Sequence, residues 1–229
     1  MRAKALLFDK DGTLFDFQKT WAGWAANMIR TRAGSDSLLV AQMAEALGFD
    51  MSAELYLPES VVIAGTAYET VEAVLPFFDD KTLDELHDEF KASQSRIAPF
   101  EVVPLRLFLG QMLEDGLLIG IATNDSESSA RAQLDQFAIT EMFHYIAGFD
   151  SGYGGKPGAG MCAAFSVQTG IAPDQIVMIG DSLHDLHAGR AAGMQTIGVL
   201  TGVATAAELS PHADVVLPDI GHLNDWLRS

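Results

Sequence analysis

The sequence has little cysteine, few basic residues and no long apolar run. Its 229 residues include one cysteine, and 14 lysines and arginines stand against 31 acidic residues, for a formal charge of −17 at pH 7. One cysteine excludes an intramolecular disulfide. The acidic balance argues against nucleic acid or an anionic membrane as a partner, because both are bound through a surplus of positive charge. An anionic substrate would therefore need a local concentration of positive charge.

The amino-terminal stretch MRAKALLFDKDG has only four consecutive apolar residues before an acidic one. That run is too short for a signal peptide or a membrane span, so we expect a cytoplasmic protein. Cys162 lies in the apolar stretch MCAAF, where a buried structural thiol is expected rather than a nucleophile.

Short apolar runs recur along the chain, and each ends in polar residues. They are ALLF before Asp9, LLIGIA before Thr123, YIAGF before Asp150, IVMIG before Asp181 and TIGVL before Thr201. Such runs indicate buried strands of a parallel sheet. Helical patterns lie between them, and this alternation predicts a doubly wound, Rossmann-like α/β sheet. Ligands bind beyond the carboxyl ends of the strands in such sheets, where these polar residues lie.

Residues 17–97 have helical spacing and no convincing buried strand. We expect a helical insertion that is entered after the first strand and left between Pro99 and Pro104. The predicted organisation is a core domain of residues 1–16 and 98–229 and a cap domain of residues 17–97. The two would share one active site if the cap folds back over the strand ends.

Two carboxylates stand close together where the first predicted strand ends. Asp9 and Asp11 are two residues apart on an extended segment, so their side chains should project together, with Lys10 pointing the other way. Like charges at short range need a compensating cation. Carboxylate oxygens suit Mg²⁺, and Asp181 and Asp185 in GDSLHD would complete the acidic cluster.

Groups that can bind a phosphate are expected beside this cluster. The ammonium of Lys156, in GGKPG, can pair with a carboxylate and with a phosphate. Thr123 and Asn124 follow a predicted strand and precede a helix, where a hydroxyl and backbone N–H groups form a natural anion site.

Four motifs occur in order at the ends of predicted strands: DKDGT (9–13), ATN (122–124), KP (156–157) and GDSLHD (180–185). Each motif alone is weak, but the ordered set is a strong signal. With this set the chain resembles the haloacid dehalogenase superfamily of hydrolases, on its phosphoglycolate phosphatase-like branch.

The resemblance implies a phosphoric monoester hydrolase that acts on a small phosphorylated metabolite. Asp9 would be the nucleophile that forms an aspartyl-phosphate, and Asp11 the general acid and then base. Thr123 and Lys156 would contact the phosphate. The implied Mg²⁺ ligands are Asp9, the backbone carbonyl of Asp11, and Asp181, with Asp185 in support.

Lys10 stands where this family usually has an apolar residue. Since it should face away from the site, we expect it to tolerate Met or Leu. A phosphomutase of the β-phosphoglucomutase kind shares the motifs and stays open as an alternative. A non-enzymatic binding module is a third reading, against which the intact acidic set argues.

Substrate choice should depend on the cap, whose residues 17–97 hold 13 acidic and 6 basic side chains. Phosphoglycolate is one candidate substrate, and it would need a cation for its carboxylate. Lys19, Arg30, Arg32 and Arg96 are the candidates for that contact. Trp21 and Trp24, three residues apart, are expected to pack in the core of the cap.

Overall fold

The structure, a computed structural model, describes residues 3–94 and 96–228. Its centre is a six-stranded sheet with the order β5-β4-β1-β6-β7-β8, in which every neighbouring pair is parallel. The strands are β1 (Ala5–Phe8), β4 (Leu118–Ala122), β5 (Tyr145–Ala147), β6 (Ile176–Gly180), β7 (Gln195–Val199) and β8 (Val215–Leu217). The predicted doubly wound α/β fold is confirmed.

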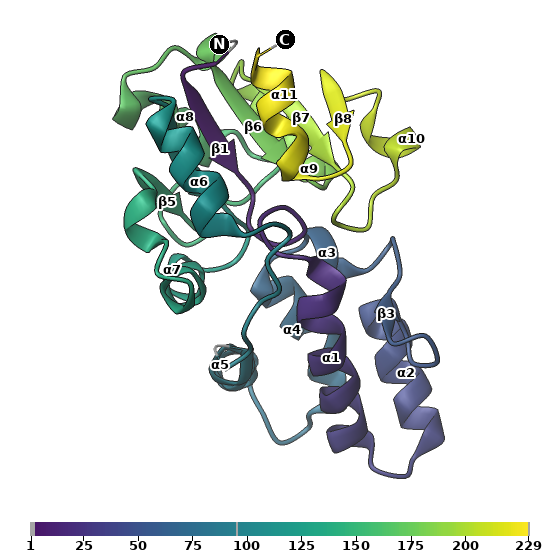
Figure 1. Cartoon of the computed structure of the whole chain (residues 1–229). Coiled ribbons are helices and arrows are strands. Elements are labelled where there is room, and N and C mark those ends of the chain that lie inside the picture. Colours follow the sequence, from purple (N-terminus) through teal and green to yellow (C-terminus); the bar gives the residue numbers. More distant parts are fainter. Residues whose placement is uncertain (1–2, 95, 229) are drawn as a thin grey trace.

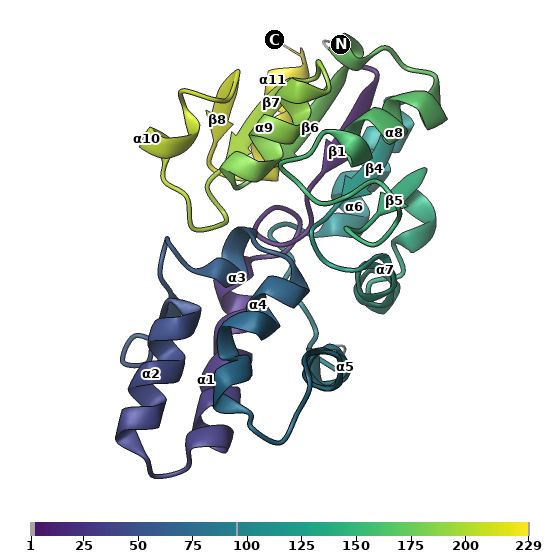
Figure 2. The same cartoon turned by 180° about the vertical axis from the view of Figure 1, so that it is seen from behind.

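Helices cover both faces of the sheet, because alternate residues of a strand point to opposite faces. Leu6 and Phe8 of β1 pack with α6 (Leu105–Glu114), α7 (Glu127–Gln136) and α11 (Leu223–Arg228). Leu7 packs with α8 (Gly160–Thr169) and α9 (Leu183–Ala191) on the other face. Figures 1 and 2 show α6 and α11 on one side of the sheet and α8 and α9 on the other. The short helix α10 (Ala206–Leu209) lies beside β8 (Figure 1). Cys162 of α8 is fully buried, as the sequence predicts.

The segment between β1 and α6 forms a separate group of helices with a hydrophobic core of its own. They are α1 (Phe17–Ala33), α2 (Ser37–Leu47), α3 (Val61–Ala64), α4 (Ala67–Val74) and α5 (Leu83–Gln94). Figure 1 shows this helical lobe at one end of the sheet, opposite the two chain termini. Four 3-10 turns complete the described chain: η1 (Leu75–Phe77), η2 (Thr140–Met142), η3 (Pro173–Gln175) and η4 (Ile220–His222).

The helical spacing of residues 17–97 gave no sign of a short pair of strands that this lobe also contains. A small antiparallel pair joins β2 (Phe49–Asp50) to β3 (Leu55–Tyr56). Strands of two residues are too short to show the alternation of apolar and polar residues by which strands are predicted.

The two connections between the lobe and the sheet lie side by side. The backbone N–H of Asp16 donates to the carbonyl of Phe100 at 2.8 Å, and the N–H of Phe100 donates to Thr20 Oγ1 at 3.1 Å. Asp16 also caps α1, because its side chain accepts from the backbone N–H of Lys19 at 3.0 Å. The helical lobe therefore begins directly beside the segment through which the chain returns to the sheet. Among the described residues, no helix has the length and apolar character needed to cross a membrane.

Candidate active site

Three buried carboxylates meet beyond the carboxyl ends of two neighbouring strands. Asp9 follows β1, Asp181 follows β6, and Asp185 lies in the first turn of α9. One oxygen from each side chain lies within 4.8 Å of the others. The fold thus brings together three of the four carboxylates that the sequence assigned to one cluster. The fourth, Asp11, is paired instead with Lys10 and Trp21, and it lines the same pocket.

The backbone around Asp181 leaves room for little but glycine. A Cβ atom at Gly12 would lie 2.4 Å from Asp181 Oδ2, and one at Gly202 would lie 1.7 Å from the same oxygen. Gly12 also has a φ of +80°, which residues with a side chain rarely adopt. These two glycines let the loop after β1 and the loop after β7 close against the carboxylate.

Lys156 links two of the three carboxylates. Its Nζ lies 2.5 Å from Asp9 Oδ1 and 2.5 Å from Asp185 Oδ1, and the side chain is buried. The second oxygen of Asp185 accepts from the backbone N–H and the hydroxyl of Ser182, at 3.0 and 2.7 Å. Since both of its oxygens are occupied, Asp185 has the contacts of a residue that positions Lys156.

The charges of this cluster call for a cation. Burial raises the pKa of Asp9 to about 7, with Lys156 opposing the rise and Asp185 adding to it. Burial also raises the pKa of Asp181 well above its ordinary value, and Asp185 and Asp9 reinforce that shift. Burial would lower the pKa of Lys156, but Asp185 and Asp9 outweigh it and raise that pKa. When all three carboxylates are ionised, the one ammonium leaves two negative charges unbalanced, and hard oxygen donors with that charge fit Mg²⁺.

Thr123 and Asn124 lie at the end of β4, next to Lys156. The side chain of Asn124 holds the Lys156 backbone from both sides: its Oδ1 accepts from the N–H at 2.7 Å, and its Nδ2 donates to the carbonyl at 3.0 Å. Thr123 is buried, and its Oγ1 accepts from the backbone N–H of Asp125 at 3.1 Å. Asn124 therefore fixes the segment that carries Lys156, in addition to any contact with a phosphate.

The structure contradicts the predicted orientation of Lys10. Its Nζ lies 2.5 Å from Asp11 Oδ2, 2.5 Å from Gln133 Oε1 and 3.3 Å from Asp125 Oδ2, and its side chain is fully buried. The prediction failed because β1 ends at Phe8, so the alternation of a strand does not continue through Lys10. The long stem of a lysine also reaches groups beside its own backbone position. Lys10 stands where the family usually has an apolar residue, and this difference was the one signal in the sequence that Lys10 makes a specific contact.

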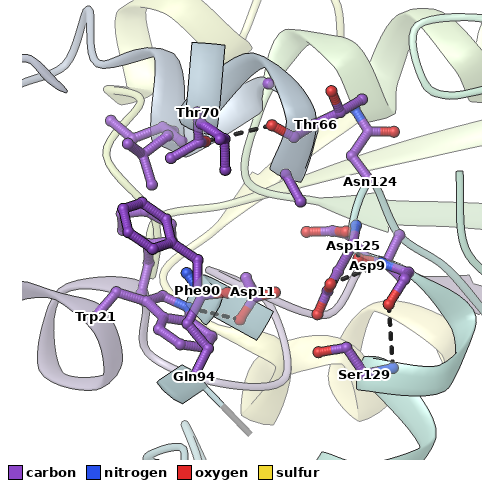
Figure 3. Close-up of a pocket in the computed structure, with 18 of the residues that line it drawn as sticks. Asp9, Asp11, Trp21, Thr66, Thr70, Phe90, Gln94, Asn124, Asp125 and Ser129 are labelled. Carbon is purple, nitrogen blue, oxygen red and sulfur yellow. Dashed lines mark hydrogen bonds between the residues drawn. The ribbon is translucent and has the colours of Figure 1, made fainter. Parts of the chain in front are cut away.

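A pocket joins these groups to the helical lobe, as Figure 3 shows. The side of the pocket that the lobe supplies is aromatic, aliphatic or neutral, apart from one lysine and one histidine, His87. Its aromatic residues are Phe17, Trp21, Trp24, Tyr56 and Phe90, and its neutral polar residues include Thr66, Thr70 and Gln94. Among the described lining residues, Lys91 is the one lysine or arginine from the lobe, and sequence reasoning missed it.

The four basic residues proposed for recognition of a carboxylate do not line this pocket. Lys19, Arg30 and Arg32 are paired elsewhere, with Asp16, Glu54 and Asp80 respectively, and Arg96 lines a different pocket of the lobe. Trp21 is 7 % exposed and packs in the core of the lobe as expected, but it also reaches the pocket.

The chain is similar in sequence and in fold to known proteins. The family model for haloacid dehalogenase-like hydrolases matches residues 6–199. The chain is 29% identical to a phosphoglycolate phosphatase of Chromobacterium violaceum, over 99% of this chain and 97% of the relative. It is 28% identical to an N-acetylmuramic acid 6-phosphate phosphatase of Pseudomonas aeruginosa, over 99% and 96%. Its fold matches the crystal structure of a predicted phosphoglycolate phosphatase from Haemophilus somnus with a TM-score of 0.75, at 17% identity and 99% coverage of both chains.

Proposed function

Since the chain belongs to the haloacid dehalogenase-like hydrolases, we propose that it is a Mg²⁺-dependent phosphatase that hydrolyses a small phosphorylated metabolite through an aspartyl-phosphate. The observation that carries this proposal is the buried cluster of Asp9, Asp181 and Asp185 with Lys156 in contact. The relatives from Chromobacterium violaceum and Pseudomonas aeruginosa, which align along almost the whole chain, are also named as phosphatases.

The proposed reaction has two displacements at phosphorus. In the first, a carboxylate oxygen of Asp9 bonds to phosphorus, the bond to the leaving-group oxygen breaks, and Asp11 gives that oxygen a proton. In the second, Asp11 takes a proton from water, the water oxygen bonds to phosphorus, and the Asp9–phosphorus bond breaks. Lys156 and Thr123 hold the phosphate oxygens, and Asn124 holds Lys156 in place.

The residues that would hold Mg²⁺ are Asp9, the backbone carbonyl of Asp11, and Asp181, with Asp185 supporting through Lys156. A bound dication supplies positive charge for the phosphate oxygens, which lowers the cost of bringing a phosphate to an acidic site.

The proposed organisation is a core domain of residues 1–16 and 98–229 and a cap domain of residues 17–97, with the pocket between them. The separate hydrophobic core of the helical lobe supports this division. Phosphoglycolate is the first substrate to test, because the relative from Chromobacterium violaceum is named a phosphoglycolate phosphatase. Lys91, which lines the pocket, is the cap residue that we propose for its carboxylate. A cytoplasmic location stays a prediction.

The test is hydrolysis of p-nitrophenyl phosphate by the whole chain, before and after treatment with a chelator. We expect activity to be lost when the chelator removes the metal and to return when Mg²⁺ is added. Full activity in excess chelator would contradict the proposal. Phosphoglycolate and N-acetylmuramic acid 6-phosphate then test the substrate. Incubation with a hexose 1-phosphate separates the two enzyme classes, because a mutase would yield the 6-phosphate and a phosphatase would release inorganic phosphate.

A further inference from the structure

Both oxygens of the Asp11 carboxylate accept a hydrogen bond, and the two donors come from different parts of the molecule. Lys10 Nζ lies 2.5 Å from Oδ2, and Trp21 Nε1 lies 2.8 Å from Oδ1. Figure 3 shows the bond from the Trp21 indole to Asp11 at the edge of the pocket. A carboxylate offers about four lone-pair positions, so these two bonds leave each oxygen one position for a transferred proton.

Lys10 is a fixed donor. Its side chain is fully buried, and besides Asp11 its ammonium contacts Gln133 Oε1 at 2.5 Å and Asp125 Oδ2 at 3.3 Å. A buried ammonium is tolerated only where acceptors surround it. Both of these further acceptors belong to the part of the chain around α7, which packs on the sheet. Lys10 therefore ties Asp11 to the core.

Trp21 is a donor from the other side of the pocket. It lies in the second turn of α1, is 7 % exposed, and packs in the hydrophobic core of the helical lobe. Its indole can donate only one hydrogen bond, and that bond goes to Asp11. A movement of the lobe relative to the sheet would change this bond, whereas the bond from Lys10 would stay.

We propose that Lys10 and Trp21 are positioning residues for Asp11, with Lys10 as an anchor in the core and Trp21 as the link between the cap and the group that transfers the proton. The proposal rests on the role proposed above for Asp11. Proton transfer needs the carboxylate within hydrogen-bond reach of the leaving-group oxygen. Two donors on opposite oxygens restrict the rotation of the side chain, and one of them is present only while the cap is in place.

The test removes the indole N–H and keeps an aromatic ring, in Trp21→Phe. Two substrates are compared: glycerol 2-phosphate, whose alkoxide needs a proton to leave, and p-nitrophenyl phosphate, whose phenolate does not. We expect kcat for glycerol 2-phosphate to fall about 10-fold, a fraction of the full effect of a general acid, with KM nearly unchanged and p-nitrophenyl phosphate much less affected. A rise in KM with kcat unchanged would overturn the proposal, and so would a rise in kcat.

The matched control is Trp24→Phe. Trp24 lies one turn further along α1 and also lines the pocket, but its indole donates to Ser93 Oγ at 3.0 Å. We expect this variant to change kcat for both substrates by the same factor. If the ratio of kcat between the two substrates changed equally in Trp21→Phe and Trp24→Phe, the indole N–H of Trp21 would have no special role.

A double-mutant cycle separates this inference from the proposed function. In an Asp11→Asn background, Trp21→Phe and Lys10→Met should cause no further loss with glycerol 2-phosphate, because the group that they position is already disabled. Additive losses would overturn the positioning role while leaving Mg²⁺-dependent hydrolysis intact. If the unmodified chain released no phosphate from p-nitrophenyl phosphate with Mg²⁺, the proposed function itself would be wrong. Lys10→Met removes a buried charge, so Trp21→Phe decides the outcome if that variant does not fold.

Discussion

The two sides of the pocket differ in chemistry. On the side of the sheet, Asp9, Asp181, Asp185 and Lys156 are all at most 7 % exposed, and direct bonds join Lys156 to Asp9 and Asp185. On the side of the helical lobe, aromatic rings and neutral polar groups form the wall, with Lys91 as its one lysine. Charge is thus concentrated where a phosphate would react, and the remainder of a substrate would meet a surface with little charge.

This difference indicates a division of labour. Fixed charges stabilise a transition state because they need no reorganisation as the reaction proceeds. Aromatic and neutral groups select a leaving group by shape and by a few hydrogen bonds. Changes on the sheet side should therefore alter turnover with every substrate, while changes to lobe residues that contact the leaving group should alter the ratio between substrates. Three predictions test this contrast.

The largest effect is expected for Asp9→Asn, which replaces the proposed nucleophile by a group of the same shape. Turnover should fall to background with every substrate, because an amide does not attack phosphorus as a carboxylate does. Phosphate release measures the loss, and mass spectrometry after rapid acid quenching should detect the aspartyl-phosphate in the unmodified chain and not in the variant. Residual turnover that required Mg²⁺ and kept the same substrate order would place the nucleophile elsewhere.

The second prediction concerns stability and pH. In metal-free protein the pKa of Asp9 is raised to about 7 from an ordinary value of 3.8, so between these values the folded state binds more protons than the unfolded state. The metal-free protein should therefore lose stability as the pH rises from about 4 to 7. Mg²⁺ should reverse this loss, because it balances the charge of the ionised carboxylates.

Thermal unfolding with and without Mg²⁺ measures the effect. At a Mg²⁺ concentration 100 times its dissociation constant, binding stabilises the fold by about 2.7 kcal/mol, or roughly 5 to 10 °C in Tm for a chain of this length. The shift should be smaller at pH 5, where protons compete for the carboxylates, and Asp181→Asn should reduce it at both pH values. A shift that did not depend on pH and survived in Asp181→Asn would locate the metal outside the acidic cluster.

The same contrast decides what the sequence could predict. The buried strands and the carboxylates at their ends follow from local pattern, since an apolar run fixes a strand and the strand fixes where its last residue points. Asp9, Asp181 and Lys156 accordingly meet as predicted. The orientation of Lys10 could not be predicted in this way, because β1 ends two residues before it. Its side chain contacts Gln133 and Asp125, which lie far along the chain.

The wall supplied by the lobe could not be predicted for a related reason. Thr66, Gln94 and Lys91 reach the pocket only because α4 and α5 pack against each other and share one hydrophobic core with α1, and no local pattern records that arrangement. The short strands β2, β3 and β8 were also missed, because two or three residues carry too little periodicity. Apart from these short strands, what the sequence left open is the set of interactions between distant segments.

The smallest effect is expected for Lys91→Gln on the lobe side. Loss of this charge should raise KM for phosphoglycolate by about 10-fold, as for a partly exposed charged hydrogen bond, and should raise KM for glycerol 2-phosphate less. Arg96→Gln is the matched control, because it makes the same charge change in a residue that lines a different pocket of the lobe. The ratio of kcat/KM between the two substrates should therefore shift in Lys91→Gln and stay constant in Arg96→Gln. If Lys91→Gln lowered both values of kcat/KM equally, Lys91 would contact the phosphate rather than the leaving group, and the division between the two sides of the pocket would not hold at this residue.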